Sequence, residues 1–186
     1  MNKVSSYKVS AVGLGVALNV IGTLIAYSLK IPILMDSLGT IMISSLIGPI
    51  YGAATGILSS LVSGVTFDIY SLYFAPVQIF VALLSAIIFK KGYMKGKKRF
   101  LGVFLISIVS AFTGAVIAAF IFGGITSSSS SYIVILLYNL GLNKVLSVFT
   151  VQFLIDYVDR FLSVSLVVPV VNALPTTLKQ KLIKEL

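Results

Sequence analysis

The charges of this chain are confined to a few short stretches, and long apolar runs separate them. Of its 186 residues, only five are Asp or Glu and 14 are Lys or Arg, whereas 58% are hydrophobic. A soluble domain of this length carries charge over its whole surface, while an uncharged run of about 17 to 25 residues is what a membrane-spanning helix requires. The pattern therefore predicts an all-α membrane protein.

Six apolar runs predict a compact bundle of six transmembrane helices in a single integral membrane domain, residues 1–186. The expected spans are 9–29, 33–47, 50–65, 74–89, 101–122 and 145–171. Only Gly48 and Pro49 separate the second span from the third, and this pair ends one helix and begins another, so we expect a tight hairpin. The apolar segment from Tyr132 to Leu142 is too short to span and is consistent with a re-entrant or interfacial helix.

The basic residues predict the orientation of the bundle. They form three clusters, at Lys3 and Lys8, at Lys90–Arg99, and at Lys179, Lys181 and Lys184. Loops rich in Lys and Arg stay in the cytoplasm, and an even number of spans places both termini on one side, so both termini are expected to be cytoplasmic. The net charge of +9 is thus explained by topology and anionic lipids, and we expect no nucleic-acid partner.

Enzymatic function is not expected. The chain has no Cys and no His, which removes thiolate chemistry, His general-base catalysis and the usual zinc sites. The sequence also contains no Walker A, dinucleotide-binding or HExxH pattern. No cofactor or metal is predicted, and any uphill transport must draw its energy from partners or an ion gradient.

The last expected span carries a row of polar residues at spacings of three and four, which places them on one helical face. These residues are Gln152, Asp156, Asp159, Arg160 and Ser163. In one interpretation Asp156 and Arg160 form an ion pair, which leaves Asp159 without a local partner. Since ionisable residues inside a membrane are costly and usually functional, this face is a candidate ligand-binding surface.

Two further stretches contain candidate polar residues. Asp36 precedes the second helix and is expected to cap it, with substrate contact as the alternative. Around Asp68, aromatic side chains alternate with polar ones in the third connection. We interpret Tyr70 as part of the interfacial aromatic belt, and Tyr73 and Gln78 as groups that stack on and hydrogen-bond a flat heterocycle.

Small residues recur four apart in the first expected span. Ala11 and Gly15 form one row, and Gly13 and Ala17 form another. Small residues let helix backbones approach closely. The rows therefore serve either packing inside the bundle or docking of another membrane subunit.

In its length, its six expected spans and its basic loop before the fifth span, the chain resembles the substrate-binding S components of energy-coupling factor (ECF) vitamin transporters. The rows in the first span are similar to the AxxxA docking motif of that family, with Gly in place of one Ala in each row. Residues 35–64 look like the second–third hairpin of the subgroup assigned to vitamin B6 or hydroxymethylpyrimidine. Residues 156–175 look like the D-x-x-D-K/R run of the same subgroup.

The resemblance implies a subunit of the bacterial cytoplasmic membrane that binds one water-soluble vitamin, such as pyridoxine, pyridoxal or hydroxymethylpyrimidine, near the external face. Its implied partners are a membrane coupling subunit, T, and two cytoplasmic ATPases. The implied docking residues are Ala11, Gly13, Gly15 and Ala17. The implied ligand-binding residues are Tyr73, Gln78, Asn139, Lys144, Gln152, Asp156, Asp159 and Arg160.

Two other classes of protein fit the sequence. An autonomous secondary transporter or channel would use Asp156 and Asp159 as an ion relay, and would need no partner. A membrane scaffold would use the acids only to pair with Lys144 and Arg160, and would bind no small molecule.

Overall fold

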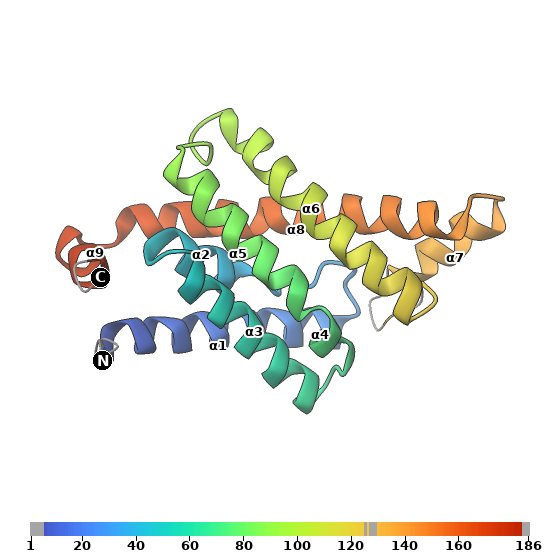
Figure 1. Ribbon diagram of the computed structural model, residues 1–186, viewed down its shortest axis with the longest axis horizontal. Coiled ribbons are helices and arrows are strands. Elements are labelled where there is room, and N and C mark those ends of the chain that lie inside the picture. The colour runs from blue at the N-terminus through green and yellow to red at the C-terminus, as the bar shows by residue number, and fades with distance from the viewer. Residues whose placement is uncertain (1–5, 125, 127–129, 184–186) are drawn as a thin grey trace.

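The computed structural model describes residues 6–124, 126 and 130–183, and every regular element in these ranges is a helix. The prediction of an all-α fold is therefore confirmed. Helices α1 and α8 lie along the long axis of the molecule, and α3, α5 and α6 cross it at a slant (Figure 1). The helices are α1 (Ser6–Leu29), α2 (Leu38–Leu46), α3 (Pro49–Thr66), α4 (Tyr70–Tyr73), α5 (Ala75–Lys90), α6 (Lys98–Ile121), α7 (Ser131–Asn139), α8 (Lys144–Ala173) and α9 (Thr176–Ile183).

Two helices in the described part of the chain are long and apolar enough to cross a membrane alone, namely α1 over Ser6–Ser28 and α6 over Lys98–Ile121. The pair α8 and α9 passes the same test together, but the chain bends by 106° between them, and α5 is a shorter apolar helix. These two or three candidate spans agree with a membrane protein, while the six-span bundle and the side of each terminus stay predictions. Of the basic clusters, Lys3 and Lys184 lie outside the described residues.

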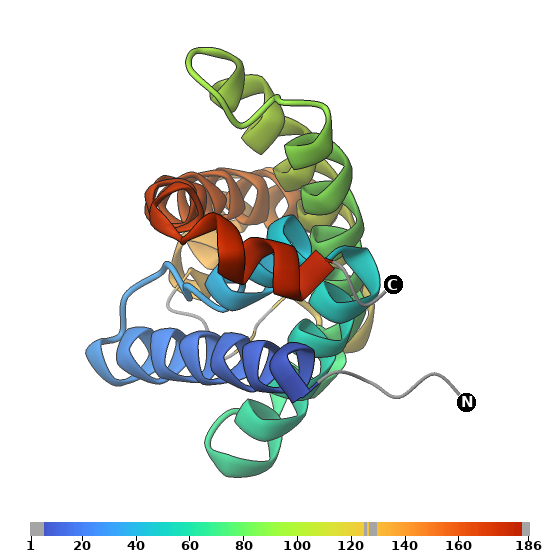
Figure 2. The same cartoon turned by 90° about the vertical axis from the view of Figure 1, so that its left-hand side faces the viewer.

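Helix α2 is the central element of the fold. It contacts α1, α3, α5 and α8, and all six residues from Gly39 to Ser44 are buried. Figure 2 shows α2 between α1 and α8. A helix of nine residues rises only about 14 Å, less than half the hydrocarbon thickness of a bilayer. The apolar composition of α2 therefore reflects burial on all sides by other helices.

The expected helix over 33–47 begins later than predicted, at Leu38. Pro32 disfavours helical backbone at the residue before it, and Met35 adopts a left-handed conformation with φ 50°. Residues 31–37 therefore form an irregular connection that reaches from the end of α1 into the bundle. This connection places Asp36 in the interior.

The hairpin predicted between the second and third spans is present. Helix α2 ends at Leu46, Gly48 has φ 123°, and Pro49 is the first residue of α3. Glycine tolerates this positive φ, and proline fits the first turn of a helix because that turn lacks intrahelical acceptors for its N–H groups. The two helices pack against each other along the hairpin.

The segment that was too short to span forms α7, which packs on α8. Its outer face is apolar and open, since Tyr132 is 79% exposed and Leu136 is 59% exposed. In Figure 1, α7 lies toward one end of the molecule, and the start of α1 lies with α9 at the other.

The two small-residue rows of α1 face different environments. Gly15 is buried against α2, where a Cβ added at Gly39 would lie 1.9 Å from the carbonyl oxygen of Gly15. Gly13 is exposed, and a Cβ added there would meet nothing within 4 Å. Ala17 is exposed as well. The row with Gly15 therefore packs the bundle, and the row of Gly13 and Ala17 stays open.

Candidate ligand-binding cavity

A cavity of about 70 Å³ lies between α3, α5 and α8, and residues of the segment before and within α4 also line it, as do Thr126 and Ser130. One water occupies about 10–15 Å³ by this measure, so the cavity has room for about five waters. Most of the residues that line it are polar. The lining residues are Thr23, Pro32, Leu34, Asp36, Ser59, Ser60, Ser63, Asp68, Tyr70, Ser71, Phe74, Val77, Gln78, Thr126, Ser130, Gln152, Ile155, Asp156, Asp159 and Arg160.

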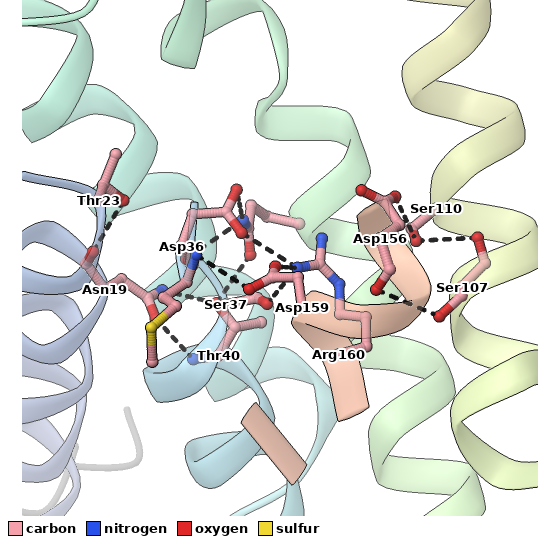
Figure 3. A network of polar contacts seen from close by, with 12 residues as sticks. Asn19, Thr23, Asp36, Ser37, Thr40, Ser107, Ser110, Asp156, Asp159 and Arg160 are labelled. Atoms are coloured by element: carbon pink, nitrogen blue, oxygen red, sulfur yellow. Dashed lines mark hydrogen bonds and ion pairs between the residues drawn. The ribbon is translucent and has the colours of Figure 1, made fainter. Parts of the chain in front are cut away.

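Arg160 is the centre of the polar network at the inner end of the cavity (Figure 3). Its Nη1 donates to Asp36 Oδ1 at 3.1 Å, to Ser37 Oγ at 2.6 Å and to Asp159 Oδ2. The guanidinium is almost fully buried. A buried charge is stable only when it is paired and hydrogen-bonded, so these contacts fix α8 to the irregular connection before α2.

Asp159 also holds the backbone of that connection. Its Oδ1 accepts a hydrogen bond of 2.9 Å from the N–H of Met35, the residue with the left-handed conformation. Asp159 therefore has partners on both carboxylate oxygens, which corrects the expectation that it lacks a local partner.

Asp36 does not cap α2 in the structure, since no side-chain cap bond forms there. Its carboxylate pairs with Arg160 instead, so the capping prediction is wrong.

Asp156 faces the same cavity from one turn earlier in α8. It accepts hydrogen bonds from Ser110 Oγ on α6 at 2.9 Å and from Gln152 Nε2 at 3.0 Å. The expected ion pair between Asp156 and Arg160 does not form among the described residues. Arg160 points instead toward the connection before α2, and both Asp36 and Asp159 pair with its guanidinium. Asp156 points toward α6.

A second branch of the network connects the cavity to α1. Gln78 donates from Nε2 to Asp36 Oδ2 at 2.9 Å, and its Oε1 accepts from Thr40 Oγ1 at 2.9 Å. Thr40 Oγ1 in turn accepts from Asn19 Nδ2 at 2.8 Å. Asn19 also donates to Ser59 Oγ at 2.9 Å and accepts from the N–H of Gly39 at 2.7 Å. Asn19 thus joins α1 to α2 and α3.

The structure brings five of the eight sequence-predicted ligand residues to the cavity wall and leaves three outside it. Those on the wall are Gln78, Gln152, Asp156, Asp159 and Arg160. Tyr73 is 47% exposed and packs edge-on against Phe122 at 5.1 Å. Asn139 and Lys144 are exposed and do not line the cavity. Tyr70, which we had assigned to the aromatic belt, lines the cavity in place of Tyr73.

Sequence reasoning did not assign Asp68, Ser60 or Ser63 to the site, although all three line the cavity. One signal for Asp68 was available, because the whole chain has only five acidic residues. Each of the four in the described ranges lines this single cavity. Acids that are so rare in a membrane protein are expected to share a function.

The side chains on the cavity wall are suited to binding a small polar molecule. No group of three or more acidic side chains is arranged to hold a metal ion within the described residues. The wall instead offers serine hydroxyls, amide and carboxylate oxygens, one guanidinium and the rings of Tyr70 and Phe74. Such a mixture can stack on a small ring and hydrogen-bond its substituents.

No protein-family model, curated protein or solved structure matches this chain. The functional argument therefore depends on the cavity and on the residues themselves, since a fold alone does not determine function.

Proposed function

We propose that this chain is a substrate-binding membrane subunit, similar to the S components of ECF-type importers, and that it binds a water-soluble vitamin or vitamin precursor. The observation that carries the proposal is a cavity between apolar helices that is lined mostly by polar residues. Polar side chains inside a membrane are costly and are retained where they serve a substrate or an ion. Vitamin B6 and hydroxymethylpyrimidine are the proposed ligands, because each is one ring with small polar substituents.

In this proposal Tyr70 and Phe74 stack on the ring, and the polar groups of α5 and α8 hydrogen-bond its substituents. The network around Arg160 holds its side chains in place before the ligand arrives. A wrong ligand that leaves one of these buried polar groups unpaired loses about 1–3 kcal/mol of binding free energy. Pre-organised donors and acceptors therefore provide selectivity as well as affinity.

The proposal also includes six spans in the bacterial cytoplasmic membrane, cytoplasmic termini, a membrane coupling subunit T and two cytoplasmic ATPases. Support for the docking part comes from α1, where Gly13 and Ala17 are exposed while Gly15 is buried. An exposed row of small residues permits close approach of a helix from another subunit. We therefore assign docking to the row of Gly13 and Ala17, and internal packing to the row of Gly15.

The direct test is thermal unfolding of the purified chain, alone in detergent, with a panel of B vitamins and precursors. A ligand present at 100 times its Kd stabilises the folded state by about 2.7 kcal/mol, which corresponds to a rise of about 5–10 °C for a chain of this size. Gln152→Leu should abolish the rise, whereas Lys95→Gln, in the basic loop, should retain it. Absence of any rise across the panel would contradict the proposal.

One observation favours the autonomous transporter as a second candidate function. Asp156 lines the cavity within a long apolar helix and has no cation partner among the described residues. Asp159 is less suited to relay an ion, because Arg160 and the Met35 N–H engage both of its oxygens. Liposomes that contain only this chain separate the two candidates: gradient-driven uptake without partners would support the transporter, and ligand binding without uptake would support the binding subunit.

A further inference from the structure

The charges around the cavity do not balance. Four carboxylates line it, and Arg160 is its only cationic side chain among the described residues. Asp36 and Asp159 share this guanidinium, so Asp68 and Asp156 lack a cationic partner. Asp156 has two hydrogen-bond donors, from Ser110 and Gln152. Asp68 is the least satisfied of the four.

Asp68 lies in the connection between α3 and α4 and is only 6% exposed. Its Oδ2 accepts one hydrogen bond, from Ser71 Oγ at 2.8 Å. The carboxylate does not cap α4, so helix capping does not account for its burial. A carboxylate has about four acceptor sites, and a buried one that lacks a counter-charge is unfavourable. Asp68 therefore has capacity for a partner that enters the cavity.

Two hydroxyls on the neighbouring wall are also without partners. Ser60 is 8% exposed and Ser63 is 3% exposed, and both line the cavity. Neither hydroxyl makes a hydrogen bond in the described part of the chain, and neither oxygen is fully enclosed, so both are open to the cavity. This observation is independent of the charges, and both hydroxyls can hydrogen-bond a polar molecule in the cavity.

The aromatic residues complete the same end of the cavity. Tyr70 and Phe74 line it beside Asp68, and both rings are fixed against Phe122, with centroid distances of 4.8 and 6.3 Å. A carboxylate next to aromatic faces is a favourable environment for an organic cation, since the ring faces and the carboxylate both attract positive charge.

We propose that the ligand of this cavity is an organic cation, a protonated amine or a charged nitrogen heterocycle, whose positive group pairs with Asp68 and whose polar substituents hydrogen-bond Ser60 and Ser63. The inference rests on the proposed binding function and specifies its substrate class. The proposal predicts different binding affinities for ligands that share a ring and differ in one charge.

The test compares charged compounds with neutral compounds of nearly the same shape. Pyridoxamine carries an ammonium group where pyridoxine carries a hydroxyl, and choline carries a quaternary nitrogen where 3,3-dimethylbutan-1-ol carries a carbon. Binding of each compound is measured by calorimetry on the full chain in detergent, for the original protein, Asp68→Asn and Asp68→Glu. The neutral vitamer is an internal control, because its binding to Asp68→Asn shows that this variant is folded.

We expect pyridoxamine to bind about ten to a hundred times more tightly than pyridoxine, the ratio that one charge-assisted hydrogen bond provides. Asp68→Asn should remove this preference by weakening pyridoxamine binding far more than pyridoxine binding, and Asp68→Glu should restore most of it. If pyridoxine binds equally well or better, or if the preference survives in Asp68→Asn, the cation proposal is wrong and the binding function stands. If no compound in the vitamin panel or in either pair binds, both proposals are wrong.

Discussion

A close backbone contact between α1 and α2 gives a sharp stability prediction. A Cβ added at Gly39 would lie 1.9 Å from the carbonyl oxygen of Gly15, 2.6 Å from its carbonyl carbon and 2.7 Å from its Cα. All three are backbone atoms, so no side-chain rotation relieves the contact. Raising 1.9 Å to the 3.0 Å that real Cβ atoms respect requires α1 and α2 to move apart by about 1 Å.

This movement would also break a buried hydrogen bond. The Gly39 N–H donates to Asn19 Oδ1 at 2.7 Å. If the helices separate by about 1 Å, this donor–acceptor distance exceeds the usual limit of about 3.2 Å. Overpacking costs about 1–3 kcal/mol, and an unpaired buried amide costs about 1–3 kcal/mol more. We therefore expect Gly39→Ala to lower the free energy of unfolding by about 2–6 kcal/mol.

Two glycines of α1 provide matched controls for Gly39→Ala. A Cβ added at Gly13 meets nothing within 4 Å, so Gly13→Ala should leave stability unchanged or raise it by up to about 1 kcal/mol through helix propensity. A Cβ added at Gly15 meets Ile43 Cγ1 at 2.7 Å and Thr55 Cγ2 at 2.8 Å, atoms of side chains that can shift, so its cost should be intermediate. Thermal and denaturant unfolding in one detergent measure the order, and a Gly39→Ala protein as stable as Gly13→Ala would refute the close approach of α1 and α2.

Three further predictions concern the site and the docking row. Arg160→Met should lower the free energy of unfolding by about 3–5 kcal/mol, because it leaves the buried Asp159 and the partly buried Asp36 without their cation; Lys95→Met, on an exposed loop residue, should change it by less than about 0.5 kcal/mol. Tyr70→Ala should weaken vitamin binding about tenfold in calorimetry through loss of ring stacking, whereas Tyr73→Ala should leave it within about twofold. Ala17→Leu should leave ligand affinity unchanged but abolish partner-dependent uptake into cells, and a loss of affinity would show that this row packs the bundle.

Hydropathy and helical periodicity were sufficient to locate most of the long helices. The expected spans at 9–29 and 101–122 match α1 and α6 within three residues at each end, because long uncharged runs have few alternatives to a helix. The same periodicity placed Gln152, Asp156 and Arg160 on one face, and they do line one cavity. These are properties of single helices, which the local sequence encodes.

The failures concern contacts between segments that are far apart in the sequence. The expected start of α2 was too early because the left-handed Met35 is held by Asp159, 124 positions later. Asp36 was assigned to a helix cap because its true partner, Arg160, is equally remote. Tyr70 and Tyr73 have the same local composition around them, and only the packing of α4 decides which ring faces the cavity. A single sequence carries no direct signal for such pairings.

The polar network also connects the two surfaces that the proposed function needs. Gln78 contacts Asp36 at the cavity wall, and through Thr40 it reaches Asn19 on α1. Asn19 is only two positions from Ala17, whose side of α1 is exposed. A ligand that draws Asp36 or Gln78 toward itself would therefore alter the hydrogen bonds that fix α1 against α2. Because these buried groups have few alternative partners, such a change would be transmitted as a shift of the helix. The helix that carries the proposed docking row is thus connected to the cavity wall through three successive hydrogen bonds.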